Sequence, residues 1–393
     1  MRIFRVIALT LVMLVLMAAP VRAEPAPDPL EQVLNKQMEM LDLDGINRFV
    51  AQLTKEREGF IPQVSLQSLI SLIRQGKGNT TWQQIGDGLI RYLFSRLATH
   101  SALLGKLIVL AIVSAVLQSL AGSFDSSGVT SVARLVCYLL VMSVAIFSFG
   151  QCLLVARDAI AQMVTFMQAM LPLLMVLITA VGGVTTAAVF RPVVIFAATA
   201  ISQTINNFVI PLTLLSVILQ LVNNLSERFK VSRLASLLKD FSYGALGIGM
   251  TLFIGVVTAQ GKFSAVADGI AFQSAKFATK NFVPVIGSVF ADAVEMVAGC
   301  SLLLKNGLGV LGSIIIFMVA AFPSVEILAM VLVYRVAAAA IQPMGENQVA
   351  DTLNNMGNTL LYVFAAVASV GVMFFVLLTS MIGAGTMAVL IRK

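Results

Sequence analysis

The sequence predicts an all-α fold: a polytopic helical membrane protein with six to eight membrane segments, some of them kinked or re-entrant. Of its 393 residues, 59% are hydrophobic and only 11% are charged, whereas soluble domains carry about 25% charged residues. The mean hydropathy is +0.95. Several apolar runs reach the roughly 20 residues that a helix needs to cross a bilayer. A soluble enzyme, a disordered chain, a coiled coil and a disulfide scaffold are therefore excluded.

The first segment, residues 1–23, is predicted to be a signal peptide. Two arginines precede the apolar run Val6 to Met17, which is too short to span a bilayer comfortably. Val21 and Ala23 suit the small-residue positions before a cleavage site, so cleavage is expected after Ala23. The alternative is an uncleaved anchor, because Arg22 is unusual at that place. In both cases the following segment begins outside the cytoplasm.

Residues 24–100 form the only substantial polar region and are predicted to be an extracytoplasmic set of amphipathic helices. Apolar residues recur at helical spacing, as at Ile85, Leu89 and Leu93. Pro62 and the Gly-containing stretch 76–82 interrupt the pattern. Because so short a region would have a marginal core of its own, it is expected to pack against the membrane domain or a partner protein.

Residues 101–393 are predicted to form a multi-pass helical membrane domain. Its apolar windows lie at about 103–121, 135–154, 169–190, 192–222, 241–260, 308–337 and 360–382, with a weaker one at 282–304. Windows 192–222 and 308–337 are too long for one untilted crossing and short for two. Each contains a central proline, Pro211 or Pro323, which predicts either a kinked helix or a re-entrant hairpin.

Basic residues predict the orientation. Loop 223–240 and the C-terminal pair Arg392-Lys393 are basic, so the positive-inside rule places both in the cytoplasm. Starting outside at residue 100, this requires window 192–222 to double back. To bring the C terminus to the cytoplasm, either one of windows 241–260, 308–337 and 360–382 must also double back, or window 282–304 must cross the membrane. The net charge of +7 belongs mainly to the membrane part and does not indicate nucleic-acid binding.

The residue inventory argues against an enzyme, a metal site or a cofactor. The chain has one His, three Cys and one Trp, and buried reduced thiols are favoured over a disulfide. Gly307-Leu-Gly-Val-Leu-Gly312 matches G-x-G-x-x-G, but no strand precedes it and an apolar segment follows. Close helix packing is the better interpretation of these glycines.

Charged side chains at membrane depth are costly and are therefore candidate functional residues. Glu326 and Arg335 are nine residues apart on one predicted helix, so they face opposite sides and each needs a partner elsewhere or a water-filled cavity. Asp292 and Glu295 share a helical face, and Lys305 follows. This group favours an amphipathic or re-entrant helix over a lipid-facing one.

A polar face is predicted inside window 192–222. Gln203, Asn206 and Asn207 lie at i, i+3 and i+4 and so project from one side of a helix. Pro211 has no N–H for the carbonyl of Asn207, which needs another donor. Either the amides bond neighbouring helices, or they line a hydrated path to which Glu326 contributes.

An internal repeat is a further hypothesis. Pro172 and Pro284 are 112 residues apart, as are Pro211 and Pro323. If each repeat crossed the membrane an odd number of times, the two would be inverted, as in many transporters.

Several strings between residues 267 and 306 carry a family resemblance. They are Ala267-Asp-Gly, Ala275-Lys-Phe, Asn281-Phe-Val-Pro-Val-Ile-Gly287, Asp292-Ala-Val-Glu295 and Gly299-Cys-Ser-Leu-Leu-Leu-Lys-Asn306. The chain resembles, over essentially its whole length, the stage III sporulation protein AE family of endospore-forming bacteria. The resemblance implies a multi-pass subunit, in the outer forespore membrane on the mother-cell side, of a channel or secretion-like complex that links mother cell and forespore. It also implies other stage III sporulation A-group proteins and a forespore protein called Q as partners.

Two functional hypotheses follow. The first is a non-enzymatic membrane subunit that works only within this complex. The second is an autonomous secondary transporter, suggested by the repeat, the broken windows and Glu326.

Overall fold

The computed structural model describes residues 44–57, 59–60, 79–122, 127–225, 230–282 and 286–390. The chain divides into two compact units, Met1–Met40 and Leu41–Lys393, and all described residues belong to the second. The predicted signal peptide therefore lies outside the described residues, as does about half of the polar segment that follows it.

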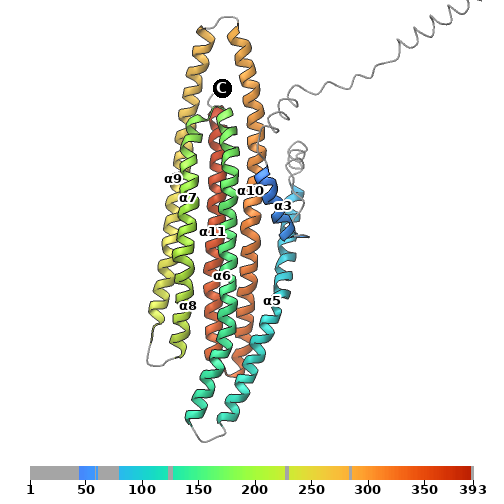
Figure 1. Cartoon of the computed structure of the whole chain (residues 1–393), viewed down its shortest axis with the longest axis vertical. Coiled ribbons are helices and arrows are strands. Elements are labelled where there is room, and N and C mark those ends of the chain that lie inside the picture. Colours follow the sequence, from blue (N-terminus) through green and yellow to red (C-terminus); the bar gives the residue numbers. More distant parts are fainter. Residues whose placement is uncertain are drawn as a thin grey trace, which may run out of the picture. The chain divides into compact units, whose positions relative to one another are not determined.

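Every regular element in the described ranges is helical, which confirms the predicted class (Figure 1). The α-helices are α3 (Asp44–Glu56), α5 (Asn79–Gly122), α6 (Ser127–Ala180), α7 (Val184–Thr204), α8 (Ile210–Leu225), α9 (Ser232–Phe282), α10 (Ile286–Ile341) and α11 (Asn347–Leu390). A π-helical turn, η1 (Ile205–Val209), joins α7 to α8, and a 3-10 turn, η2 (Gln342–Met344), follows α10.

Six of the described helical segments are long and apolar enough to cross a membrane, which is the lower limit of the predicted six to eight. They are Gln84–Leu120, Val132–Ala180, Val184–Asn224, Ser232–Ala271, Val297–Met344 and Asn347–Ala384. The count is low because neighbouring sequence windows share helices. Window 135–154 and most of window 169–190 belong to α6, while 308–337 and most of 282–304 belong to α10.

The predicted re-entrant turn within 192–222 is wrong. The chain continues in one direction from α7 through η1 into α8 (Figure 1). The backbone N–H of Ile210 donates to the carbonyl of Ile205, so the helix widens by one residue immediately before Pro211. A π-bulge is one of the ways in which a helix absorbs a local break in its hydrogen bonds without reversing. The other proline-containing window is also continuous, because Pro323 lies inside α10.

Successive long helices alternate in direction. The C-terminal ends of α5, α8 and α10 lie at one end of the bundle, and those of α6, α9 and α11 lie at the other (Figure 1). We call these the inner and outer ends. With residue 79 outside, as predicted, six single crossings would place the start of α9 in the cytoplasm, in line with the prediction for loop 223–240, and no segment would have to double back. The same count moves the predicted location of the C terminus to the outside.

The centre of the bundle is formed by α10 and α11, which pack against each other and against α6. Helices α5 and α9 are more peripheral. At the centre the contact is close: a Cβ added to Gly371 of α11 would lie 2.5 Å from the Cβ of Ala320 on α10. Small residues allow such approach between helices in a membrane.

The predicted repeat gains no support from the elements. Pro172 lies inside α6, whereas Pro284 falls outside the described residues. Pro211 follows a π-turn, but Pro323 lies within an uninterrupted α-helix. Of the two proline pairs, the described one, Pro211 and Pro323, therefore does not mark matching helices, and the other stays a prediction.

Candidate functional site: a polar cluster around Glu326

The most concentrated polar cluster in the described part joins α5 to α10. The Tyr92 hydroxyl donates a 2.9 Å hydrogen bond to Oε2 of Glu326. The same oxygen lies 3.6 Å from Nε of Arg96. The Arg96 guanidinium lies 4.8 Å from the centroid of the Tyr92 ring. Tyr92 and Arg96 are four residues apart and therefore occupy one face of α5, so Glu326 receives both groups at once.

The residues after α3 close the cluster on its other side. The Arg57 guanidinium lies 5.2 Å from the centroid of the Phe322 ring, one helical turn before Glu326. Phe60 meets the Tyr92 ring edge-on at 5.4 Å. A Cβ on Gly88 would lie 2.3 Å from the Phe60 carbonyl oxygen, so glycine is needed for this approach. The described part of the predicted extracytoplasmic region is thus packed against the membrane helices, as expected.

Replacing Glu326 tests how the cluster holds α5. Glu326→Gln keeps an oxygen that accepts from Tyr92, whereas Glu326→Leu removes the acceptor. The partly exposed ion pair with Arg96 is expected to contribute about 0–1 kcal/mol. Leaving Tyr92 without its partner is expected to cost about 1–3 kcal/mol.

In thermal unfolding of the purified protein in detergent, the midpoint temperature should therefore be highest for wild type, lower for Glu326→Gln and lowest for Glu326→Leu. Equal midpoints for wild type and Glu326→Leu would show that the contact does not stabilise the fold. Asp351→Leu, at an exposed carboxylate on α11, is the matched control.

Two further carboxylates join helices near the ends of the bundle. Glu346, buried between η2 and α11, accepts a 2.5 Å hydrogen bond from Ser114 of α5 and another from Gln118. Asp268 of α9 accepts from the backbone N–H groups of Thr185 (2.7 Å) and Thr186 (2.8 Å). These are free N–H groups of the first turn of α7, which a carboxylate stabilises through hydrogen bonding and the helix dipole.

Glu326 and Arg335, each predicted to need a partner elsewhere or a water-filled cavity, both contact a neighbouring helix. Arg335 is exposed on α10 and donates to Oδ1 of Asn358 on α11 at 2.9 Å. Lys305 is fully buried, and its Nζ donates to the carbonyl of Ile382 at 2.8 Å. Helix α10 is continuous here, so Lys305 does not lie on a re-entrant segment, and its burial agrees with the expectation that it does not face lipid.

Asp292 and Glu295 also lie on α10, but their side chains are outside the described part. The three cysteines, Cys137, Cys152 and Cys300, are free and buried, as predicted.

The predicted polar face lies on and beside the π-turn. Gln203 and Asn207 are exposed, and Asn206 is half-buried with its Nδ2 donating to the Ser202 hydroxyl at 3.4 Å. Glu326 is bound to α5, whereas η1 packs against α7, α8 and α9. The structure does not join Glu326 to these amides, and a hydrated path along them stays a prediction.

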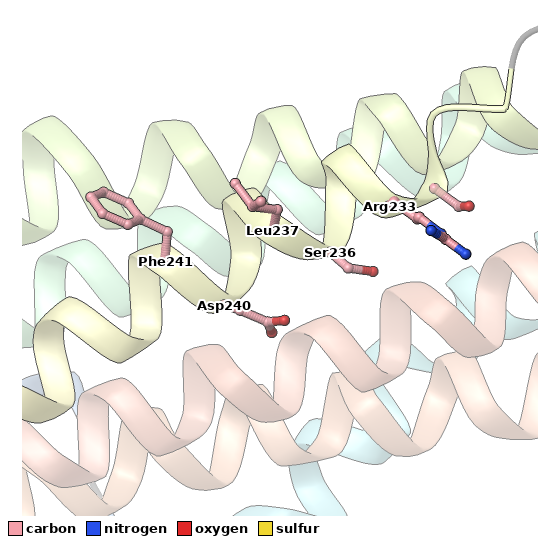
Figure 2. Close-up of a pocket in the computed structure, with 6 residues that line it drawn as sticks. Arg233, Ser236, Leu237, Asp240 and Phe241 are labelled. Carbon is pink, nitrogen blue, oxygen red and sulfur yellow. The ribbon is translucent and has the colours of Figure 1, made fainter.

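An open recess lies along the first turns of α9. Figure 2 shows its lining side chains, with Arg233, Ser236 and Asp240 among them. Its volume is about 590 Å³, and its lining, Ser232 included, comes from one helix. A recess with a single wall cannot enclose a small molecule. It marks the inner end of the bundle as a place where polar side chains meet solvent.

Several residues of these contacts were not singled out from the sequence: Tyr92, Arg96, Ser114, Glu346 and Asp268. Tyr92 and Glu326 are 234 residues apart, and no local pattern joins them. In the described residues, no three His, Cys, Asp or Glu side chains are placed to hold a metal ion. The clusters hold helices together.

Long apolar helices joined by internal polar contacts define this chain as a multi-pass helical membrane protein. It belongs to the stage III sporulation protein AE family, whose model matches residues 64–385. Stage III sporulation protein AE of Bacillus subtilis (strain 168) is 37% identical over 371 residues, which cover 94% of this chain and 93% of that protein. No solved structure matches the chain. The family predicted from the sequence is confirmed.

Proposed function

We propose that this chain is a non-enzymatic membrane subunit of the channel or secretion-like complex that links mother cell and forespore during sporulation. Membership of a sporulation family supports the biological setting. One structural observation favours a subunit: Glu326, Glu346 and Asp268 are each bound to another helix. The carboxylates therefore stabilise a fixed arrangement of helices instead of surrounding a common binding site.

The alternative, an autonomous secondary transporter, has no observation in its favour. Such a protein would hold its substrate near the middle of the membrane between matching repeats. Pro211 and Pro323, the described pair of prolines that suggested a repeat, do not mark matching helices, and both segments that were candidates for re-entrant turns are continuous. Glu326, the candidate coupling residue, is bound to Tyr92 and lies beside Arg96.

The proposed location is the outer forespore membrane on the mother-cell side, and the proposed partners are the other stage III sporulation A-group proteins and the forespore protein Q. In this arrangement the end of α6 and the start of α7 face the space between the two membranes. The region around α3 lies on the same side, because it packs against the outer part of α5.

Affinity purification in mild detergent from sporulating cells tests the proposal. A-group proteins are expected to co-purify with the tagged chain in a fixed ratio, and the complex should stay intact during size-exclusion chromatography. A strain carrying an unrelated tagged multi-pass protein is the control. The proposal fails if the chain elutes alone under conditions that keep other membrane complexes intact, and solute uptake by the pure chain in liposomes would favour the transporter.

A further inference from the structure

The apolar helices are much longer than a bilayer is thick. The six candidate spans contain 37 to 49 residues, or about 56–74 Å at 1.5 Å per residue, against a hydrocarbon core of about 30 Å. Even a tilt of about 40° reduces a 60 Å helix only to about 46 Å along the membrane normal. Part of the apolar bundle must therefore lie outside the hydrocarbon layer.

Polar side chains of α5, α6, α7, η1 and α10 lie at about the same height, midway along the bundle. On α10 and α5 this level is set by the bond between Glu326 and Tyr92. The Tyr334 hydroxyl donates to the Ala145 carbonyl at 2.7 Å. Because α10 and α6 are antiparallel, Glu326 lies level with about residue 153 of α6. Asp158 is five residues further along α6, an offset of about 8 Å along the helix axis.

The same level continues onto the π-turn. Ala156 and Ile160 of α6 line a small apolar cavity together with Ile205 and Val209. Asn207 is therefore level with Asp158. We call the set of polar side chains at this level the polar belt: Tyr92, Arg96, Arg157, Asp158, Gln203, Asn206, Asn207 and Glu326.

The exposure of the polar belt does not suit a lipid environment. Arg157 and Asp158 are exposed on the surface of α6, as are Gln203 and Asn207 on α7 and η1. Charged side chains inside a membrane normally face a protein interior or water. The polar belt therefore belongs at a water boundary, with about one bilayer thickness of helix on each side.

Helix α5 shows which side is embedded. On the outer side of Tyr92 it exposes Asp87 and Arg91, while on the inner side residues 101–120 carry Lys106 as their one charged residue. The inner half thus has the composition of a membrane span along α5, and the outer half does not.

We propose that the polar belt marks the outer water boundary of the membrane, so that only the inner half of the bundle is embedded and the outer half projects about 30 Å beyond the lipid. Exposed apolar residues of the outer half, such as Val176, Phe196 and Phe263, then lie outside the lipid. This inference stands independently of the proposed function.

Two phenylalanines provide a matched test. Phe147 on α6 and Phe196 on α7 are 69% and 70% exposed. Phe147 lies eleven residues from Asp158 towards the inner end, and Phe196 lies eleven residues from Asn207 towards the outer end. Phe147→Cys and Phe196→Cys are labelled with bimane in the purified full chain, which is then placed in phosphatidylcholine vesicles with brominated acyl chains.

Bimane at 147 is expected to lose at least half of its fluorescence relative to unbrominated vesicles, and bimane at 196 less than a tenth. A membrane-impermeant thiol reagent should modify the 196 cysteine at least tenfold faster. The unsubstituted chain, whose cysteines are all buried, measures the background. Phe241→Cys and Phe263→Cys repeat the comparison on α9, where Phe241 lies towards the inner end and Phe263 towards the outer end. Equal quenching at 147 and 196, or quenching at 196 alone, overturns the proposal.

Discussion

Gly371→Val is expected to separate α10 from α11 and to cause a large loss of stability. The added Cβ would lie 2.5 Å from the Cβ of Ala320, and alanine has no flexible end that can move aside. Overpacking of this kind typically costs about 1–3 kcal/mol, occasionally more. It falls on the most extensive helix pair of the bundle, so the loss should lie at the upper end.

The matched control is Gly244→Val on α9, where an added Cβ meets nothing within 4 Å. Thermal unfolding followed by fluorescence-detected size-exclusion chromatography should show a clearly lower unfolding midpoint for Gly371→Val and an almost unchanged midpoint for Gly244→Val. If both variants unfold like wild type, the close contact between α10 and α11 is not present in the protein.

Asp268→Ala is expected to have an effect of similar size. The carboxylate is 2% exposed and accepts both backbone N–H groups of Thr185 and Thr186. Its removal leaves the buried N–H of Thr186 without an acceptor, at about 1–3 kcal/mol. The part-buried N–H of Thr185 also loses its acceptor, at a smaller cost because water can reach it. The start of α7 should then detach from α9.

Asp268→Asn keeps one acceptor oxygen, so its stability should lie between those of wild type and Asp268→Ala. Hydrogen exchange at the first turn of α7 provides a local measurement: protection there should drop in Asp268→Ala while the centre of α10 stays protected. Unchanged protection at Thr185 and Thr186 would contradict the assigned contact. Asp351→Ala, at an exposed site, controls for the loss of a carboxylate.

Composition and periodicity predicted the helical membrane class, because hydrophobicity is a property of each stretch of sequence. They did not show which windows share a helix. The charged pair at Arg157 and Asp158 suggests a break between windows 135–154 and 169–190, yet α6 continues through it with both side chains on its surface. A charge on an exposed helix face does not interrupt the backbone hydrogen bonds.

Proline also suggested a break in the chain where the helix is in fact continuous. Pro211 is compatible with a hairpin, but a π-turn absorbs the missing N–H. The need of Glu326 for a partner could be predicted from the cost of an unpaired charge. The identity of Tyr92 could not, because the contact depends on how α5 packs against α10 across 234 residues of sequence.

The most direct test of the six-crossing fold is the sidedness of the two ends of the α7–η1–α8 segment. Val184→Cys and Lys230→Cys lie at its opposite ends, and both positions are exposed. An impermeant thiol reagent applied to intact protoplasts is expected to label position 184 directly and position 230 only after permeabilisation. Labelling of both positions from the same side would mean that the segment doubles back, and it would contradict the continuous crossing on which the fold depends.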